Sequence, residues 1–487
     1  MSSHSPSHAS SQEIRSRLDH PVIDADGHII EFLPAVRDFL VEEGGRKLAE
    51  EFDQVVDAGR RLESLSIDER RAMGAFKLTW WPYPAENSLD RATGMLPGLL
   101  YDRLDEFGID YAVLYPTMGL TGMSLDQTDL RRASIRAFNR CAAEMFEPYS
   151  DRLTPVAMIP MYDPGEALDE LEYCVGELGL KTVLLNGLVY RPLTKDPDAS
   201  RGARWVDAFG PESPYDYDPV WAKCVELGVA PTFHSSAMGF GSRMSQTNYV
   251  YNHIGNFAQA GEATCRTMVM HGVPQRFPEL RCAFLEGGVA WAANLYSDLI
   301  GHFEKRGLAG IDAYDPDRID RSQLRALFES HGSERFKKHL DELEEGLGHL
   351  SGPGLFQDDF AGTGIECAED LKTIFERNFR FGCEADDPMN AVGFNRDINP
   401  LGAQMRAIFS SDIGHWDVTD MSETVEEAWE LVEAGLLTEA DFRDFTFVNA
   451  ATMWTEPNPR FFEGTVIESA ARALADSSGQ LIDEDAR

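Results

Sequence analysis

Acidic and histidine side chains stand directly after apolar runs in four parts of the sequence. The first is the segment VIDADGH at residues 22–28, in which Asp24, Asp26 and His28 follow one another at intervals of two. Side chains two residues apart on a strand point to the same face, so these three can share one face at a strand end. Two of them can chelate one metal ion; the alternative is an ordinary polar loop or helix cap.

Each of the other three apolar runs is followed by a single candidate residue. His234 follows residues 229–233, Glu286 follows residues 281–285, and Asp412 comes soon after residues 407–409. Each has a structural alternative: a satisfied core histidine, a carboxylate paired with an arginine, and a helix N-cap. A buried carboxylate needs some partner, because burying its charge alone is costly.

Eight apolar, β-branched runs alternate with amphipathic segments such as residues 129–146 and 164–178. Each run has the length of a buried parallel strand. Eight strand–helix units in order predict an α/β fold, a (β/α)8 TIM-type barrel with helical insertions, with an open doubly wound sheet as the alternative. The expected strands are residues 22–26, 111–115, 154–159, 182–185, 229–233, 281–285, 379–383 and 407–409.

The candidate segments fall at the C-terminal ends of the first, fifth, sixth and eighth expected strands. Polar residues at these ends form the active sites of such barrels, and a chance distribution would scatter them. We therefore expect a metal ion held by Asp26, His28, His234 and Asp412.

Three stretches exceed a minimal barrel and are expected to be insertions, at about residues 34–100, 191–218 and 302–378. The first and third carry charged helical sequence, and the second, rich in Pro, Asp and Tyr, is expected to be a loop. The barrel itself is expected to span residues 21–468. A disordered tail at 1–20 and an acidic flexible tail at 469–487 flank it.

The amino-acid composition excludes some classes of binding partner. The chain has 44 Lys and Arg against 82 Asp and Glu, a net charge of -38, which disfavours nucleic acid and anionic membranes. No apolar run reaches the roughly 18 residues of a membrane span.

Seven cysteines without a CxxC pair predict reduced thiols, and hence a cytoplasmic protein. We expect a small-molecule substrate and an oligomer, with itself or with a related subunit.

The ordered motifs resemble the amidohydrolase superfamily, in the amidohydrolase-related branch that includes nonoxidative decarboxylases and dinuclear non-heme oxygenases. The resemblance covers residues 21–465 and implies a metal-dependent barrel enzyme. The matching segments are VIDADGH (22–28), LDEFGID (104–110), PTFH (231–234), GVPQRFPELR (272–281), FLEGGVAW (284–291), FSSDIGHWD (409–417) and FTFVNAATM (445–453).

The sequence also departs from that family. Asp26 stands at the first position of the usual H-x-H motif, and Glu286 stands where many relatives carry a histidine. Asn186 and Gly187 end the fourth expected strand, where a carbamylated lysine would be needed. The usual carbamate-bridged pair of metals is therefore not expected.

Glu286, His253 and His302 could instead supply a second set of ligands; the alternative for both histidines is a surface or core role. Carboxylate and imidazole ligands without thiolate favour iron, manganese or zinc. The interpretation we favour is a dinuclear Fe or Fe/Mn monooxygenase, which uses dioxygen to hydroxylate a C–H bond of a small organic substrate.

The main alternative is a mononuclear Zn or Mn hydrolase, or a nonoxidative decarboxylase of a small carboxylic acid. Glu286 or Asp412 would then act as general acid or base. In either case His415 is expected to contact the substrate or to support Asp412. A catalytically inactive barrel that serves as a subunit is a third hypothesis, against which the metal-type residues argue.

Overall fold

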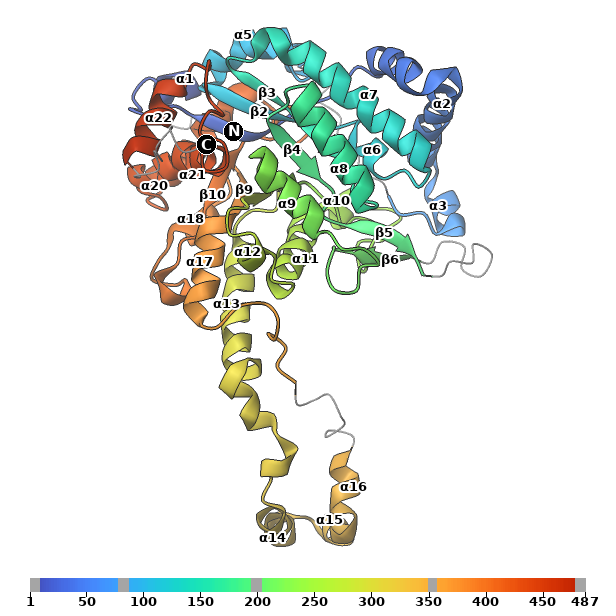
Figure 1. Cartoon of the computed structure of the whole chain (residues 1–487), viewed down its shortest axis with the longest axis vertical. Helices are drawn as coiled ribbons and strands as arrows, with labels where there is room; N and C mark the ends of the chain where they lie inside the picture. The colour runs from blue at the N-terminus through green and yellow to red at the C-terminus, as the bar shows by residue number, and fades with distance from the viewer. Residues whose placement is uncertain (1–8, 78–86, 194–203, 349–356, 478–487) are drawn as a thin grey trace, which may run out of the picture.

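The computed structural model describes residues 9–77, 87–193, 204–348 and 357–477, and its centre is a barrel of eight parallel strands (Figure 1). Each predicted run overlaps one strand, which confirms the TIM-type barrel. In spatial order the strands are β1 (Ile23–Ile29), β2 (Tyr111–Pro116), β3 (Leu153–Ile159), β4 (Thr182–Leu185), β7 (Pro231–Phe233), β8 (Cys282–Phe284), β9 (Phe379–Glu384) and β10 (Ala407–Ser410).

The first and last strands meet, so the sheet curls into a barrel and does not stay open. The amide of Asp412 donates to the carbonyl of Asp26 at 3.1 Å, and the amide of His28 donates to the carbonyl of Ile413 at 2.9 Å. These two bonds place the C-terminal ends of β1 and β10 next to each other. The predicted open-sheet alternative is wrong.

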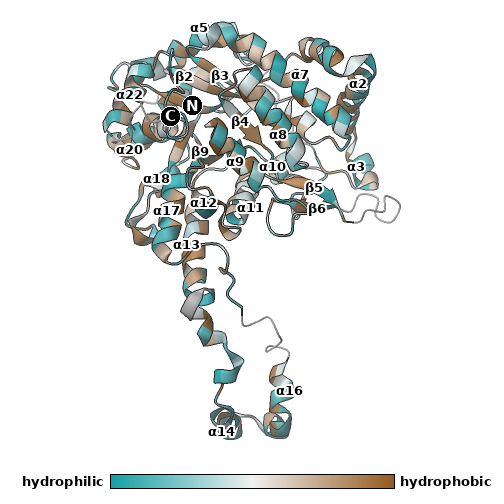
Figure 2. Cartoon of the chain, in the orientation of Figure 1, coloured by the Kyte–Doolittle hydropathy of each residue, from teal (hydrophilic) through white to brown (hydrophobic). Residues whose placement is uncertain are grey.

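The strands are apolar because both of their faces are covered. Successive residues of one strand enter two separate buried clusters: Val113 belongs to the cluster that contains Met158 and Ala283, whereas Ala112 belongs to the cluster that contains Ala157. In Figure 2 the strands are mostly brown and lie beneath helices that carry teal residues. The barrel helices are α7 (Thr128–Phe146), α8 (Pro164–Glu172), α9 (Asp218–Leu227), α11 (Asn256–Met270), α13 (Ala290–Arg306), α17 (Ala368–Asn378) and α19 (Thr424–Glu433).

Shorter helices join these elements. They are α6 (Leu120–Met123), α10 (Tyr249–His253), α12 (Val273–Arg276), α18 (Asn390–Phe394), α20 (Glu439–Arg443) and α21 (Asn449–Thr455). Among the residues that the structure describes, no helix combines the length and apolarity needed to cross a membrane.

The first two predicted insertions are ordered where the structure describes them. The described residues of this insertion form α2 (Leu33–Ser64), which packs along α7, and then α3 (Ile67–Met73), α4 (Ser88–Thr93) and α5 (Pro97–Phe107); residues 78–86 lie outside the described residues. The second insertion was expected to be a loop, but it contains an antiparallel pair, β5 (Val189–Pro192) and β6 (Arg204–Asp207). Four-residue strands in a Pro- and Asp-rich stretch are too short to leave a visible alternation.

The third insertion projects from the barrel. The chain leaves the end of α13, passes through α14 (Arg321–His331), α15 (Glu334–Lys337) and α16 (Leu343–Gly348), and returns to α17 (Figure 1). α17 itself is the barrel helix that precedes β9. The predicted range 302–378 therefore also covered the end of α13 and the whole of α17.

Both chain ends carry helices inside the predicted tails. Within residues 1–20, α1 (Ser11–Arg15) begins with a capping box at Ser10, and the Ser11 hydroxyl donates to the carbonyl of Ser422 at 2.6 Å. Within residues 469–487, α22 (Glu468–Ser477) covers the first part. Residues 1–8 and 478–487 lie outside the described residues.

Candidate metal centre

The candidate ligands converge at the C-terminal end of the barrel. Asp26 and His28 lie on β1, His234 follows β7 directly, and Glu286 and Asp412 lie two residues beyond β8 and β10. All five are buried. These residues come from strands that are far apart in the sequence. The four that were expected to hold the first metal are thus neighbours in space.

The donor atoms are close enough for shared coordination. The Nε2 atom of His28 lies 3.2 Å from Oδ1 of Asp412 and 3.6 Å from Oδ1 of Asp26. The Nε2 atom of His234 lies 2.7 Å from Oε2 of Glu286. Because metal–ligand bonds to nitrogen and oxygen are about 2.0–2.2 Å long, two ligands of one ion lie no more than ~4.4 Å apart.

Two overlapping groups of donors meet this requirement approximately. Asp26, His28 and His234 form one, and His28, Glu286, Asp412 and His415 form the other, with all donor atoms of a group within 4.8 Å of one another. The two groups share His28. They are therefore best described as one six-residue cluster around a common centre.

Several of these buried atoms lack a hydrogen-bond partner. Both carboxylate oxygens of Glu286 and of Asp412, Oδ1 of Asp26, and both ring nitrogens of His28 and of His234 are in this position. Buried polar atoms are nearly always paired, since an unpaired one costs about 1–3 kcal/mol. A divalent cation would satisfy these atoms together, so the residues present fit such an ion.

The pKa shifts of these residues also favour a bound cation. Burial raises the pKa of Asp26, Glu286 and Asp412 well above the usual range, and the carboxyl of Glu286 adds to the rise at Asp412. Burial lowers the pKa of His28 and His234. The histidines are therefore neutral, as metal ligation requires, and the carboxyl groups lack a positive charge that a cation would provide.

A sequence profile that describes amidohydrolases matches residues 23–336. The chain belongs to the amidohydrolase family. This confirms the resemblance drawn from the motifs. The matched residues include Asp26, His28, His234 and Glu286.

Several solved structures resemble this chain. An amidohydrolase from Mycobacterium avium subsp. paratuberculosis is 16% identical, with a TM-score of 0.52, over 90% of this chain and 100% of that one. The 2,6-dihydroxybenzoate decarboxylase from Rhizobium is 14% identical over 90% and 99%, with a TM-score of 0.48. The 5-carboxyvanillate decarboxylase from Sphingomonas paucimobilis is 14% identical over 89% and 98%, with a TM-score of 0.47. At 16% identity, the likeness to the Mycobacterium structure concerns the fold alone.

His415 lies inside this amidohydrolase centre. Its Nδ1 atom is 2.6 Å from Oδ1 of Asp412, and its ring stacks on the ring of His28 with centroids 3.9 Å apart. Its Nε2 atom lies 3.1 Å from the Thr117 hydroxyl, on the loop after β2. The structure thus brings the predicted catalytic residues Glu286, Asp412 and His415 together.

The two histidines predicted for a second metal behave differently. His302 is exposed on α13, and its Nδ1 lies 2.6 Å from the carbonyl of Asp298, one turn earlier. The structure does not bring it to the centre. His253 ends α10 and lies against Tyr249, Trp416 and Phe257, whose ring also contacts His234. It therefore belongs to the rim of the site and to neither donor group.

Two acidic residues near the centre were missed. Glu384 ends β9 and is exposed as a residue, but desolvation of its carboxylate, together with the charges of Glu286 and Asp417, raises its pKa to about 8. The rule that identified Glu286, a carboxylate at the end of an apolar run, would also have found Glu384. Asp417 lies in the quoted motif at residues 409–417, and its charge raises the pKa of both Glu286 and Asp412.

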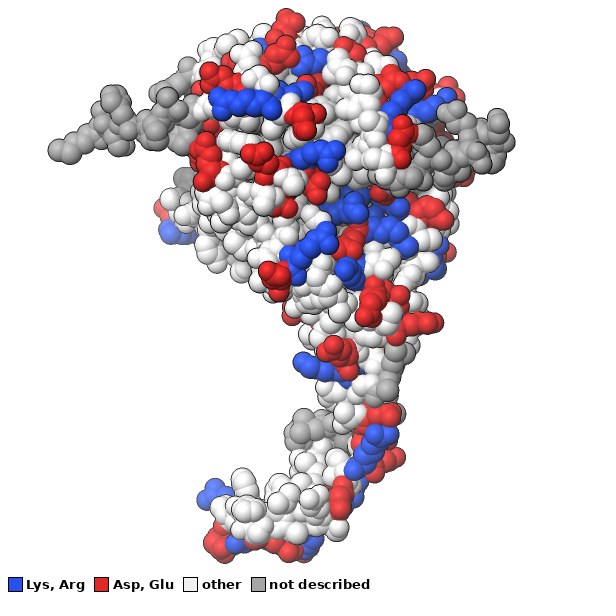
Figure 3. Space-filling view, turned by 90° about the vertical axis from the view of Figure 1, so that its left-hand side faces the viewer, with Lys and Arg blue, Asp and Glu red and all other residues white. Residues whose placement is uncertain are grey.

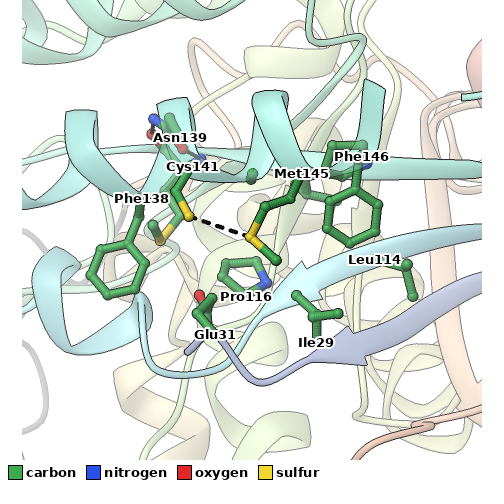
Figure 4. A pocket seen from close by; sticks show the side chains of 13 residues that line it. Ile29, Glu31, Leu114, Pro116, Phe138, Asn139, Cys141, Met145 and Phe146 are labelled. Carbon is green, nitrogen blue, oxygen red and sulfur yellow. Dashed lines mark hydrogen bonds between the residues drawn. The ribbon is translucent and has the colours of Figure 1, made fainter. Parts of the chain in front are cut away.

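Glu31 was missed because it follows β1 without any motif. Its carboxylate accepts hydrogen bonds from the amides of Thr117, Met118 and Gly119, so it holds the loop that contacts His415. It also lines a small apolar cavity between β1, β2 and α7, beside Cys141 (Figure 4). Burial raises the pKa of Glu31 to about 7.

The backbone is strained at two site residues. Glu286 and Asp412 have φ values of 56° and 51°, in the left-handed region that residues with a Cβ rarely adopt. Each such residue costs about 1–2 kcal/mol, and this cost is usually found at functional positions. The bend turns each carboxylate from its strand end into the centre.

Proposed function

We propose that this amidohydrolase-family protein is a nonoxidative decarboxylase of a small carboxylic acid that works with one divalent cation, Zn or Mn. Asp26, His28, His234 and Asp412 would hold the cation. When bound, it supplies a Lewis acid that orients the substrate's oxygen atoms. The observation that carries the proposal is the carboxyl group of Glu286, buried beside this ligand set with both of its oxygens lacking a hydrogen-bond partner.

Glu286 has the properties of a proton donor. Loss of CO2 leaves a pair of electrons on carbon, and a proton must be delivered to that carbon. Burial raises the pKa of this carboxyl group and so favours its protonated form, as a general acid requires. The Nε2 atom of His234 lies 2.7 Å from Oε2 of this carboxyl group, so Glu286 lies next to the ligand set.

Hydrolysis by the same site is the closest competing activity. A hydrolase needs a general base at neutral pH, and the burial that makes Glu286 a good acid makes it a poor base. Glu286 therefore suits decarboxylation, in which it would protonate carbon, better than hydrolysis.

A dinuclear oxygenase, favoured by the sequence alone, has less support. Its second ligand set was to be Glu286, His253 and His302. His302 is exposed on α13, and His253 lies at the rim beside Trp416. Only Glu286 remains from that set within the donor cluster.

The test combines a metal count with an anaerobic activity screen. Protein produced with iron, manganese and zinc is analysed for metals per chain, then incubated without oxygen with a panel of small carboxylic acids. We expect one Zn or Mn per chain, and CO2 release that Glu286→Gln abolishes. The matched control Glu384→Gln, next to the site but outside both donor groups, should keep its metal.

Other outcomes identify the competing activities. Two redox-active metals per chain together with substrate-dependent oxygen consumption would replace the proposal by the oxygenase. Cleavage of ester or amide substrates without CO2 release would replace it by the hydrolase.

A further inference from the structure

One ring nitrogen of His415 lies among the donor atoms of the metal centre. Its Nδ1 atom is 2.6 Å from Oδ1 of Asp412, and that oxygen atom is also 3.2 Å from Nε2 of His28. The rings of His28 and His415 are stacked with centroids 3.9 Å apart. Because two ligands of one ion lie no more than ~4.4 Å apart, Nδ1 and Oδ1 are close enough to share a cation.

The other ring nitrogen of His415 faces a hydroxyl group. Its Nε2 atom lies 3.1 Å from Oγ1 of Thr117, on the turn after β2. A histidine that binds a metal through one nitrogen normally donates the N–H of the other nitrogen to an oxygen atom, which fixes the tautomer and the orientation of the ring. Thr117 is placed to accept such a bond, and this tautomer has its lone pair on Nδ1.

The turn that carries Thr117 is held by the carboxylate of Glu31. This carboxylate accepts hydrogen bonds of 3.2, 2.8 and 3.1 Å from the amides of Thr117, Met118 and Gly119. A Cβ at Gly119 would lie 2.9 Å from Oε1 of Glu31 and 2.6 Å from Cε of Met158, so a glycine suits this close approach. The position of the hydroxyl group is therefore fixed relative to β1, which carries two of the proposed ligands.

We propose that His415 is a fifth ligand of the cation, through Nδ1, and that Thr117 and Glu31 hold its ring in this orientation. The proposal rests on the cation site of the proposed function and does not depend on the reaction. It adds a third imidazole to those of His28 and His234. Thr117 and Glu31 are positioning residues, because they act on the cation only through the ring of His415.

The competing arrangement leaves His415 outside the ligand set. In that case Nδ1 carries the proton and donates it to Asp412, and Nε2 accepts a hydrogen bond from the hydroxyl of Thr117. The two arrangements differ in which ring nitrogen carries the proton and in whether the other one is bonded to a metal. A measurement on the ring nitrogens themselves therefore separates them.

The measurement must also ignore cations that bind loosely to the acidic surface. The chain has a net charge of -38, and on the face shown in Figure 3 acidic side chains are spread over the barrel and the helical projection, often next to basic ones. A metal count alone does not distinguish such cations from one in the centre. A coupling between a metal nucleus and a ring nitrogen does, because it requires a direct bond.

NMR spectroscopy of the cadmium-loaded protein counts the imidazole ligands. The full-length protein, with 15N in its histidine rings, is loaded with one equivalent of cadmium-113, a spin-active substitute for zinc or manganese. We expect three nitrogens coupled to cadmium in the wild type and two in His415→Gln. The matched control is His253→Gln, which changes a histidine outside both donor groups and should keep all three couplings.

Cadmium affinity tests the two positioning residues. Thr117→Val removes the hydroxyl group and should weaken binding about tenfold, whereas Thr117→Ser keeps the hydroxyl and should bind as the wild type does. Glu31→Gln turns an NH2 group toward the amide donors and should also weaken binding. Because both changes act through one ring, their combined loss should be smaller than the product of the single losses. Thr373→Val, at an exposed hydroxyl on α17, is the control.

Each result bears on one of the two proposals. Two coupled nitrogens in the wild type, or a third coupling that survives in His415→Gln, would overturn the ligand assignment and leave the decarboxylase in place. Losses that multiply in the double variant, or that Thr117→Ser does not restore, would overturn the positioning role. Three couplings in a protein that releases no CO2 would support this ligand set and contradict the proposed reaction. Melting temperatures of the metal-free variants identify any that fail to fold, and the wild-type count needs no variant.

Discussion

The hydroxyl of Ser411 donates a hydrogen bond of 2.5 Å to Oδ2 of Asp24, and the amide of Ser411 donates one of 3.0 Å to Oδ1. Asp24 also accepts from the amide of Asp26 at 3.2 Å. This buried carboxylate therefore joins the end of β1 to the residue before Asp412. Asp24 is a positioning residue, because it connects the segments that carry two candidate ligands and is in neither donor group.

Replacing Asp24 should weaken metal binding without removing a ligand. In Asp24→Asn, one acceptor is lost and an NH2 group faces the Ser411 donors. Substitutions of groups that support metal ligands typically cost about 10–100-fold in affinity, and we expect a loss of this size. Competition with a chromogenic chelator measures it. Asp169→Asn, at an exposed ion pair with Arg132, is the control and should bind metal normally.

Metal binding should release protons and become tighter as the pH rises. In the metal-free protein the raised pKa values of the two ligand carboxyl groups, Asp26 and Asp412, favour their protonated forms, and a cation must displace those protons. Titration calorimetry in buffers of different ionisation enthalpy counts the protons released. Affinity that is constant between about pH 6 and 8 would contradict this account.

His28 and His302, two of the four histidines predicted as metal ligands, should differ in their effect on metal binding. His28→Ala should abolish stoichiometric metal binding, because His28 belongs to both donor groups. His302→Ala should bind one equivalent of metal with wild-type affinity, since His302 is exposed on α13. Elemental analysis of both purified variants decides the matter. Loss of metal in His302→Ala would contradict the single-metal centre and support a dinuclear one.

Glu31 should make the metal-free protein less stable as the pH rises. Its pKa is about 7 in the folded protein and near 4.5 when unfolded, so the folded state binds more protons between these values. Stability from this group is full below pH 4.5 and is lost as the pH passes through about 7. The melting temperature of the wild type relative to Glu31→Gln should therefore fall between pH 5 and 8. A difference that grows with pH would have the wrong sign.

Gly27 should not tolerate a side chain. A Cβ there would lie 2.5 Å from Oδ2 of Asp24 and 2.9 Å from Cδ2 of Leu114, at the point where the register of β1 shifts. Gly27→Ala should lower the free energy of unfolding by about 1–3 kcal/mol, measured by urea denaturation. Gly176→Ala is the matched control, because an added Cβ there meets nothing within 4 Å. It should be neutral or slightly stabilising.

The sequence by itself determined the eight strands and the four segments that converge. A strand buried on both faces must be an apolar run, and a polar residue at its end must have a reason to be there. For this reason His234, Glu286 and Asp412 could be identified without a structure. Glu384 satisfies the same pattern and was missed only because the pattern was not applied to the seventh strand.

Only the tertiary structure decided which candidates meet. Spacing along a chain does not fix the distance between two elements, so His302 could be imagined near Glu286 although α13 presents it to solvent. The same limit applies to the third insertion, whose helical sequence gives no sign that it projects from the barrel. The left-handed turns at Glu286 and Asp412 were also invisible, because side chains with a Cβ adopt them only where the surrounding structure compensates for the strain.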